Sequence, residues 1–260
     1  VAARAKSMGF YVGLSTNGTL IDAPTAARIA ALGFDYVGIS LDGLQATHDR
    51  FRRKPGAFDA SLAGLRLCRD QGVKVGLRFT VTQDNAADLP MLLALAEDER
   101  IDKFYLSHLN YAGRGNKNRG SDAHFQTTRR AMDLFFDTAW DYQRRGLAKE
   151  FVTGNNDADG AYLLFWVRRN HPEREAQLRA KLAAWGGNAS GVNVANIDNL
   201  GNVHPDTMWW NYSLGNVRER PFSQIWVDRS DPIMAGLKQR PRTVKGRCGA
   251  CTLFDVCGGN

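Results

Sequence analysis

Cysteine, histidine and proline are scarce in this chain of 260 residues, which has four cysteines, five histidines and eight prolines. Most of the cysteines cluster near the carboxyl end, which argues against a disulfide framework and favours a reducing compartment. No apolar run approaches the roughly 18 residues needed to cross a bilayer, and the opening VAARAKSMGF lacks the pattern of a signal peptide. We therefore expect a cytoplasmic protein with no membrane partner.

A long block of lysine and arginine is also missing. The net charge of +7 favours an anionic partner. Because the basic residues are scattered, they do not indicate nucleic acid, and a small polycarboxylate fits the charge equally well.

Short apolar runs alternate with amphipathic stretches through the first half of the chain. The predicted strands cover 10–14, 36–41, 73–82 and 103–110, and the predicted helices cover 22–32, 58–71, 86–99 and 124–145. This alternation predicts an α/β fold with parallel strands and right-handed crossovers. The continuous apolar runs predict strands that are covered on both faces. The pattern leaves open whether the sheet is a barrel or an open sheet.

Polar and glycine-containing stretches follow each of the predicted strands. They read STNG, SLDG, TVTQDN and HLNYAGRG. Because ligands bind at the carboxyl ends of parallel strands in both barrels and open sheets, we expect a binding site there.

The pattern changes after about residue 151, where helices are followed by short strands and turns. We therefore predict two domains, 1–150 and 151–260. The second ends on Cys248, Cys251 and Cys257, a Cys-x2-Cys-x5-Cys array interspersed with glycines. Thiolates at this spacing favour zinc or an iron–sulfur cluster, and the metal itself is left open.

The order and spacing of several motifs resemble the radical SAM superfamily, specifically members with an auxiliary cluster domain of the SPASM or twitch type. The motifs are TNG, SLDG, HDRFR, GAFD, TVTQDN and NLGNVHP, followed by the cysteine array. Among these members, those of heme d1 biosynthesis are the most similar. The resemblance implies a partial (β/α)6 radical SAM barrel with its last four units, and a small C-terminal auxiliary iron–sulfur cluster domain.

One motif of the family is absent from this sequence: the Cys-x3-Cys-x2-Cys loop that binds the radical-generating cluster. Together with an opening residue, Val1, that is not methionine, this absence leads us to expect a segment of a longer protein. As written, the segment is not expected to generate a radical alone.

The resemblance also implies which side chains bind S-adenosyl-L-methionine (SAM). The expected contacts are Thr16, Asn17, Ser40, Asp42, Arg78, Leu109 and Asn110. The residue types by themselves also allow structural roles for these side chains. Thr16, Asn17, Ser40 and Asp42 suit strand-end turns, Leu109 suits core packing, and Arg78 suits an ion pair with an acidic side chain.

The implied cofactors are SAM, a radical-generating 4Fe-4S cluster with ligands upstream of this sequence, and an auxiliary 4Fe-4S cluster on the cysteine array. The implied activity is removal of propionate side chains from a siroheme-derived tetrapyrrole. An electron donor such as flavodoxin or ferredoxin would be a partner, and nucleic acid would not. No catalytic residue is predicted.

Further side chains are candidates with a structural alternative. Trp209 and Trp210 suit either stacking on the ring or core packing. The other candidates are Arg114, Lys117 and Arg119 for carboxylates, His108 and His204 for iron, and Asp206 as a fourth cluster ligand. We expect Cys68, on an apolar helix face, to be a packed thiol.

Two alternatives remain open from the sequence. One is another radical SAM enzyme with an auxiliary cluster, either a heme-forming decarboxylase or a peptide maturase. The other, from a different class, is a zinc-ribbon protein that binds nucleic acid through its basic charge.

Overall fold

The computed structural model describes residues 1–259. The chain forms two compact units, one of residues 1–109 and 118–155 (unit 1) and one of residues 110–117 and 156 onward (unit 2). Across the described residues, no helix combines the length and the apolar character needed to span a membrane. The domains 1–150 and 151–260 remain a prediction.

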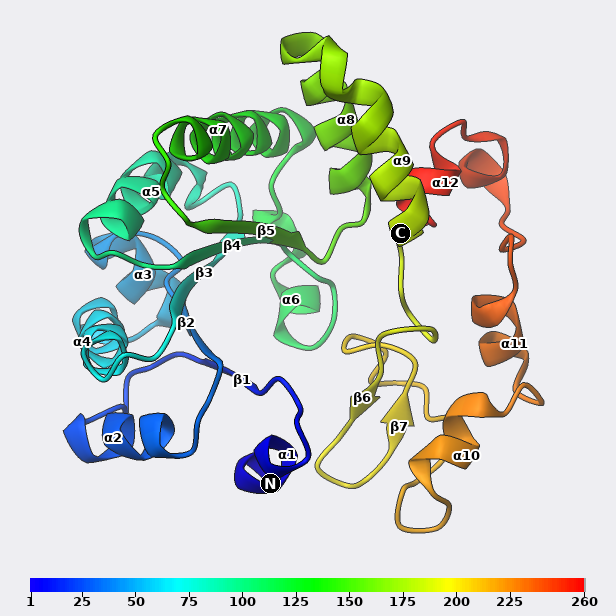
Figure 1. Cartoon of the computed structure of the whole chain (residues 1–260), viewed down its shortest axis with the longest axis horizontal. Coiled ribbons are helices and arrows are strands. Elements are labelled where there is room, and N and C mark those ends of the chain that lie inside the picture. Colours follow the sequence, from blue (N-terminus) through cyan, green and yellow to red (C-terminus); the bar gives the residue numbers. More distant parts are fainter. Residues whose placement is uncertain (260) are drawn as a thin grey trace. The chain divides into compact units, whose positions relative to one another are not determined.

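Unit 1 is built on a five-stranded parallel sheet with the order β1-β2-β3-β4-β5 (Figure 1). The strands are β1 (Gly13–Thr16), β2 (Tyr36–Ser40), β3 (Val75–Val81), β4 (Lys103–His108) and β5 (Glu150–Gly154). The helices are α1 (Ala2–Ser7), α2 (Ala23–Ala31), α3 (Gln45–Arg52), α4 (Ala57–Asp70), η1 (Ala86–Asp88), α5 (Leu89–Asp98), η2 (Arg119–Ser121) and α7 (Phe125–Arg144). The α/β class and the parallel sheet were predicted correctly.

Local sequence signals explain where the elements begin and end. The Asp22 carboxylate accepts a hydrogen bond from the Thr25 backbone N–H at 2.9 Å and caps α2, whose first turn contains Pro24. Gly33 then ends the helix with φ of +70°, a conformation that glycine adopts without steric cost. These are the signals from which this helix was predicted.

The outer face of the sheet is apolar and carries the helices (Figure 1). Helix α4 packs on β2 and β3, α5 on β4, and α7 on β5. The side chains on this face are almost completely buried, and they include Val37, Ile39, Val75, Leu77, Phe79, Phe104 and Leu106. This layer supplies the hydrophobic core of unit 1.

The opposite, inner face of the sheet carries different side chains, although the strands were predicted from continuous apolar runs. The ring of Tyr36 lies over Gly38 and Gly76, so a Cβ atom built on Gly76 would come within 2.2 Å of the Tyr36 hydroxyl. Tyr105 lies over Gly154 in the same way, because a Cβ atom built on Gly154 would come within 1.7 Å of the Tyr105 hydroxyl. Glycine is required at these positions because the rings occupy the space of a side chain. The resulting face consists of tyrosine, glycine and polar groups.

Two elements of unit 1 were missed from the sequence, and one strand was misplaced. Neither α3 nor β5 was predicted, so the sheet has one strand more than the four expected. Strand β1 starts at Gly13, whereas the prediction began with Phe10 and Tyr11, which are 58% and 68% exposed. An apolar run therefore did not mark the limits of this strand, whose four residues are all exposed or partly exposed.

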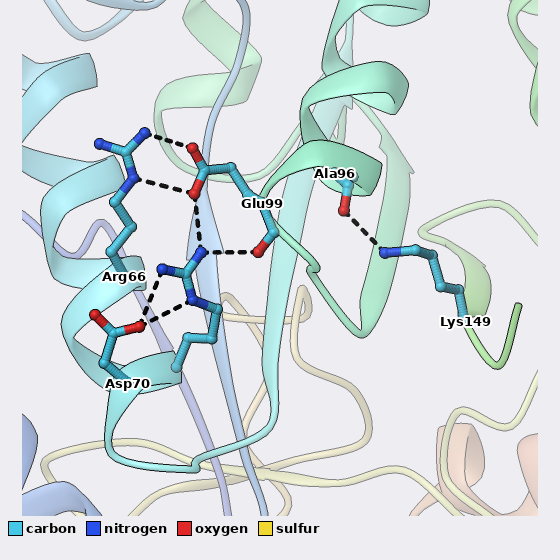
Figure 2. A network of polar contacts seen from close by, with 6 residues as sticks. Arg66, Asp70, Ala96, Glu99 and Lys149 are labelled. Carbon is cyan, nitrogen blue, oxygen red and sulfur yellow. Dashed lines mark hydrogen bonds and ion pairs between the residues drawn. The ribbon is translucent and has the colours of Figure 1, made fainter.

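The amino edge of the sheet carries a network of ion pairs (Figure 2). The guanidinium of Arg66 pairs with Glu99, and Arg69 donates to Glu99 at 2.9 Å and to Asp70 at 3.0 Å. The ammonium of Lys149 donates to the Ala96 carbonyl at 2.9 Å. These side chains join the ends of α4 and α5 at the edge of the sheet opposite to the predicted site.

Unit 2 is mostly helical and contains one short antiparallel pair of strands. Its elements are α6 (Arg114–Lys117), α8 (Ala158–Asn170), η3 (Pro172–Arg174), α9 (Glu175–Trp185), β6 (Asn196–Ile197), β7 (Val203–His204), α10 (Phe222–Val227), α11 (Pro232–Lys238), η4 (Gly246–Ala250) and α12 (Phe254–Cys257). Helices α8, α9 and α12 pack together. In the cysteine array, Cys248 lies in η4, Cys251 directly follows η4, and Cys257 is the last residue of α12.

Candidate functional site

Ser40 and Asp42 lie where β2 ends, at the carboxyl edge of the sheet. Ser40 is the last residue of β2, is partly exposed, and stands in register with Arg78 of β3. Asp42, by contrast, is only 2% exposed. The two residues of the SLDG motif therefore lie in different surroundings.

The Asp42 carboxylate is held by protein groups on both oxygens. One oxygen pairs with the Arg52 guanidinium, and the other accepts the Thr80 backbone N–H at 3.2 Å. Burial raises the pKa of Asp42, and the charge of Arg52 and the Thr80 amide oppose this rise. These contacts join β2, β3 and α3, which is the strand-end role that the residues alone left open. The contact of Asp42 with SAM remains a prediction.

His48 supports the same strand end. Its Nδ1 atom accepts the Asp42 backbone N–H at 2.9 Å, and the residue is 1% exposed. Burial lowers the pKa of His48 to about 4, and the nearby charge of Arg52 acts in the same direction. His48 is therefore neutral at physiological pH.

Asn85 joins the ends of β2 and β3. Its amide nitrogen donates to the carbonyls of Asp42 and Thr80 at 3.0 and 2.9 Å, and its amide oxygen accepts the Thr82 N–H at 2.7 Å. Such a side chain satisfies backbone groups where the ladder of the sheet stops.

His48, Arg52 and Asn85 were not identified as site residues from the sequence. A signal was available for two of them, because a spacing of four places His48 and Arg52 on one side of a helix. Their motif HDRFR was recognised as a pattern, but helix α3 was not predicted.

Arg78 projects from the inner face. Its guanidinium lies 4.0 Å from the centre of the Tyr105 ring, a distance suited to a cation–π contact. No carboxylate of residues 1–259 forms an ion pair with Arg78. The structural ion pair that was considered as an alternative is therefore not formed within the described chain, and binding of the SAM carboxylate remains a prediction.

Thr16 and Asn17 form the turn after β1. The Thr16 hydroxyl accepts the Gly18 N–H at 3.2 Å, and the Asn17 side chain accepts the Thr19 N–H at 3.3 Å. The Asn17 carbonyl accepts from the Ser61 hydroxyl of α4 at 2.7 Å. Both side chains thus perform turn functions, and their contact with a cofactor is still a prediction.

Leu109 and Asn110 follow β4 and belong to different units. Leu109 is the last residue of the first segment of unit 1, and Asn110 begins unit 2. Both are partly exposed, and the Asn110 side chain accepts the Ala112 N–H at 3.0 Å. The structure places Ser40 and Arg78 in register on adjacent strands, and Asp42 lies two residues beyond the end of β2. It leaves the predicted roles of Leu109 and Asn110 as predictions.

The three thiols of the array differ in exposure. Cys248 and Cys251 are exposed, and Cys257 is partly buried. Burial raises the pKa of the Cys257 thiol.

The fit of these thiols to a metal depends on the kind of centre. Within residues 1–259, no three His, Cys, Asp or Glu side chains surround a point that could hold a single metal ion. A 4Fe-4S cluster instead binds each thiolate to a different iron atom. The all-thiol donor set fits such a cluster, and it does not form a closed zinc site as it stands.

The remaining candidates in unit 2 have structural partners. His204 is 2% exposed and contacts the Tyr212 carbonyl at 2.7 Å and the Asp198 carboxylate at 3.3 Å. The Asp206 carboxylate accepts from the Ser190 hydroxyl at 2.7 Å and from the Met208 N–H at 3.0 Å.

Other candidates are distributed over both units. Trp210 is 58% exposed, and Trp209 is partly exposed. His108 is 9% exposed at the end of β4. The side chain of Arg114 lies outside the described part of the chain. Cys68 is fully buried in α4, as expected of a packed thiol.

Comparison with known proteins identifies the class. Residues 1–96 match the radical SAM superfamily. The chain is 56% identical over its full length to a pre-heme d1 synthase of Dinoroseobacter shibae, and 44% identical to an Fe-coproporphyrin III synthase of Methanosarcina barkeri. Residues 1–96 therefore belong to the radical SAM superfamily.

The match does not extend over the whole of either relative. The chain covers 65% of the length of the first protein and 66% of the second. Among solved structures, Streptococcus suis SuiB bound to S-adenosylmethionine aligns with a TM-score of 0.70 at 18% identity, over 98% of this chain and 56% of that one. At this identity the likeness supports the fold alone, and it agrees with a partial radical SAM barrel.

Proposed function

We propose that this chain is part of a radical SAM enzyme of heme d1 biosynthesis, which removes propionate side chains from a siroheme-derived tetrapyrrole. The observation that carries the proposal is the 56% identity, along the full length of the chain, to a pre-heme d1 synthase. The second relative is named for an iron porphyrin product. Both names give a tetrapyrrole product, and a tetrapyrrole product favours a tetrapyrrole substrate for this chain.

The inner face of unit 1 supports a cofactor site at the carboxyl edge. When bound, SAM and a radical-generating 4Fe-4S cluster supply hydrogen-atom abstraction. Ser40 offers a partly exposed hydroxyl, and Arg78 offers a cation that has no acidic partner in residues 1–259. We assign Arg78 to the carboxylate of SAM, because a buried or half-buried guanidinium is stabilised by an anion.

Asp42, His48 and Asn85 then act by holding the strand ends. Their contacts fix the backbone that carries Ser40 and Thr80. Catalysis by radical chemistry depends on this kind of positioning, since the abstracted hydrogen must lie next to the reactive carbon.

Unit 2 would contribute an auxiliary 4Fe-4S cluster on Cys248, Cys251 and Cys257. Support comes from the all-thiol donor set and from the exposure of Cys248 and Cys251. The scattered positive charge suits the carboxylates of a tetrapyrrole. A small electron carrier such as flavodoxin or ferredoxin would complete the system.

The full-length protein, purified without oxygen and reconstituted with iron and sulfide, tests this function. We expect SAM-dependent release of 5′-deoxyadenosine with a siroheme-derived substrate, and loss of whole propionate side chains by mass spectrometry. Loss of carbon dioxide alone would favour the heme-forming decarboxylase. A protein that binds only zinc and retains an oligonucleotide would favour the nucleic-acid-binding alternative.

Substitution of Arg78 tests the proposed contact between its guanidinium and the carboxylate of SAM. Arg78→Met removes the cation and should weaken SAM binding by roughly tenfold, because a charge-assisted hydrogen bond contributes about 1.5–3 kcal/mol. Arg78→Lys should retain part of the affinity. Equal SAM affinity in Arg78→Met and the wild type would remove Arg78 from the cofactor site.

A further inference from the structure

Arg242 makes an unusual set of contacts beside the cysteine array. Its Nη1 atom donates to the Asn188 side-chain oxygen at 2.9 Å and to the Gly258 carbonyl at 3.3 Å. Its Nη2 atom donates to the Ser190 carbonyl at 2.9 Å, and its Nε atom to the Leu237 carbonyl at 3.0 Å. One guanidinium thus connects the residue after Cys257 with two other segments of unit 2.

Asn188 holds the same turn from the other side. Its backbone N–H donates to the Cys257 carbonyl at 2.9 Å. Its side-chain amide nitrogen donates to the Asp157 carboxylate at 2.8 Å, and its side-chain oxygen accepts the hydrogen bond from the Arg242 guanidinium. Cys257 is therefore linked through Asn188 to both a carboxylate and a guanidinium.

The backbones of the two segments lie in direct contact. A Cβ atom on Gly187 would lie 2.1 Å from the Cys257 carbonyl carbon, and one on Gly258 would lie 2.6 Å from the Gly186 carbonyl oxygen. Gly187 and Gly258 also have φ of +64° and +70°. Only glycine permits this approach without displacing one of the segments.

Cys257 differs in this respect from the other thiols of the array. Cys248 and Cys251 are exposed, and the Cys251 N–H donates to the Cys248 carbonyl at 3.2 Å at the end of η4. The carbonyl of Thr252, next to Cys251, accepts an exposed hydrogen bond from Arg179 at 3.2 Å. The Cys257 turn is fixed more closely, by the Asn188 N–H, by the part-buried Arg242 guanidinium and by the close approach of Gly187. The array thus has one anchored thiol and two on an exposed turn.

We propose that Arg242 and Asn188 are positioning residues that fix Cys257 as the anchored ligand of an iron–sulfur cluster. The inference rests on the proposed auxiliary cluster. Groups that orient the ligands of a metal centre tune both its retention and its potential. Arg242 has a second effect, because its positive charge lies next to the turn that carries the Cys257 sulfur. A cation there stabilises the reduced, more negative state of a cluster.

The test compares Arg242→Gln, Arg242→Lys and wild type in the full-length protein. Arg168→Gln is the matched control, because Arg168 lies in the same unit and pairs with Glu175 on the surface. In the iron-free protein, iodoacetamide labelling of Cys257 is measured relative to Cys248. In the loaded protein, iron loss to a chelator and the reduction potential of the cluster are measured.

We expect Arg242→Gln to raise the ratio of Cys257 to Cys248 labelling severalfold and to speed iron loss by about tenfold. Its cluster potential should fall, and Arg242→Lys should restore the potential more than the labelling ratio, since lysine keeps the charge but loses the planar set of donors. Arg168→Gln should match the wild type in all three measurements. Where Arg242→Gln does not fold, Arg242→Lys carries the labelling test.

An unchanged labelling ratio in both Arg242 variants, with unchanged iron retention, would overturn the proposal. A wild-type protein that takes up no iron and sulfide would contradict the auxiliary cluster instead. In that case the labelling ratio still decides whether Arg242 holds the Cys257 turn. Failure of the proposed function is therefore distinguished from failure of this inference.

Discussion

The two edges of the sheet in unit 1 both pair arginines with carboxylates, but in different surroundings. At the amino edge, the side chains of Arg66 and Arg69 are 49% and 30% exposed in their pairs with Glu99 (Figure 2). At the carboxyl edge, Arg52 pairs with a carboxylate, Asp42, whose side chain is 3% exposed. Arg52 is itself 30% exposed, so the two edges differ mainly in the carboxylate: the Glu99 side chain is 15% exposed, and the Asp42 side chain only 3%.

This difference determines what each pair contributes. Ion pairs that water and salt can screen contribute about 0–1 kcal/mol to stability. A buried ion pair stabilises a protein little more than two hydrophobic side chains of similar volume would. Removing only one partner of the pair, however, leaves an uncompensated buried charge and is strongly destabilising. The amino edge should therefore tolerate substitution, and the carboxyl edge, where the proposed site lies, should not.

The largest effect is expected for Arg52→Met. This change leaves the Asp42 carboxylate buried without its cation and should lower the free energy of unfolding by about 3 kcal/mol. Urea unfolding followed by circular dichroism measures the effect. The double variant Asp42→Asn with Arg52→Met should recover part of the loss, because the buried charge is then absent. A loss below 1 kcal/mol in the single variant would show that water reaches Asp42.

A smaller effect is expected from His48 as the pH falls. The pKa of His48 is about 4 in the folded protein and 6.5 in the unfolded chain. Between these values the unfolded state binds more protons, so the stability is fully present above pH 6.5 and decreases as the pH falls towards 4. We expect this contribution to reach roughly 2 kcal/mol.

His48→Asn is the variant that isolates this contribution. An asparagine oxygen can still accept the Asp42 N–H but does not titrate. The raised pKa of Asp42 acts in the opposite direction at low pH, and both proteins contain it. The difference between their stabilities, measured by urea unfolding from pH 7 to pH 4, should therefore change with pH. A constant difference would contradict a buried neutral His48.

The smallest effect is expected for Glu99→Gln at the amino edge. Arg66 lowers the pKa of Glu99, but both arginines remain in contact with water when the charge is removed. We expect a loss of about 1 kcal/mol or less, decreasing as salt is added. Thermal unfolding at low and high salt measures this. A loss as large as that of Arg52→Met would remove the contrast between the two edges.

Much of unit 1 could be predicted because its signals are local. The cap at Asp22, Pro24 and Gly33 set the limits of α2 correctly. Ser40 and Arg78 stand in register on adjacent strands, and Asp42 follows β2, but the binding site expected at the strand ends stays a prediction. The helix α3 and the strand β5 escaped prediction, because short segments depend on tertiary partners for their stability.

The functional residues show the same limit. The spacing of Cys248, Cys251 and Cys257 indicated a metal centre from the sequence alone. Arg242 and Asn188 carry no local signal, since their contacts join residues about 50 to 70 positions apart. Asp42 illustrates the intermediate case, where the motif was recognised but the burial of its carboxylate was not.

By itself, the sequence determined the alternation of strands and helices, the polar strand ends and the thiol array, because each depends on neighbours along the chain. Only the tertiary structure decided that helices cover one face of the sheet and that tyrosines and Arg78 occupy the other. It also decided that Asp42 is enclosed and that Cys257 is anchored. The physical reason is that burial and pairing depend on groups brought together by folding, and chain spacing does not specify which groups meet.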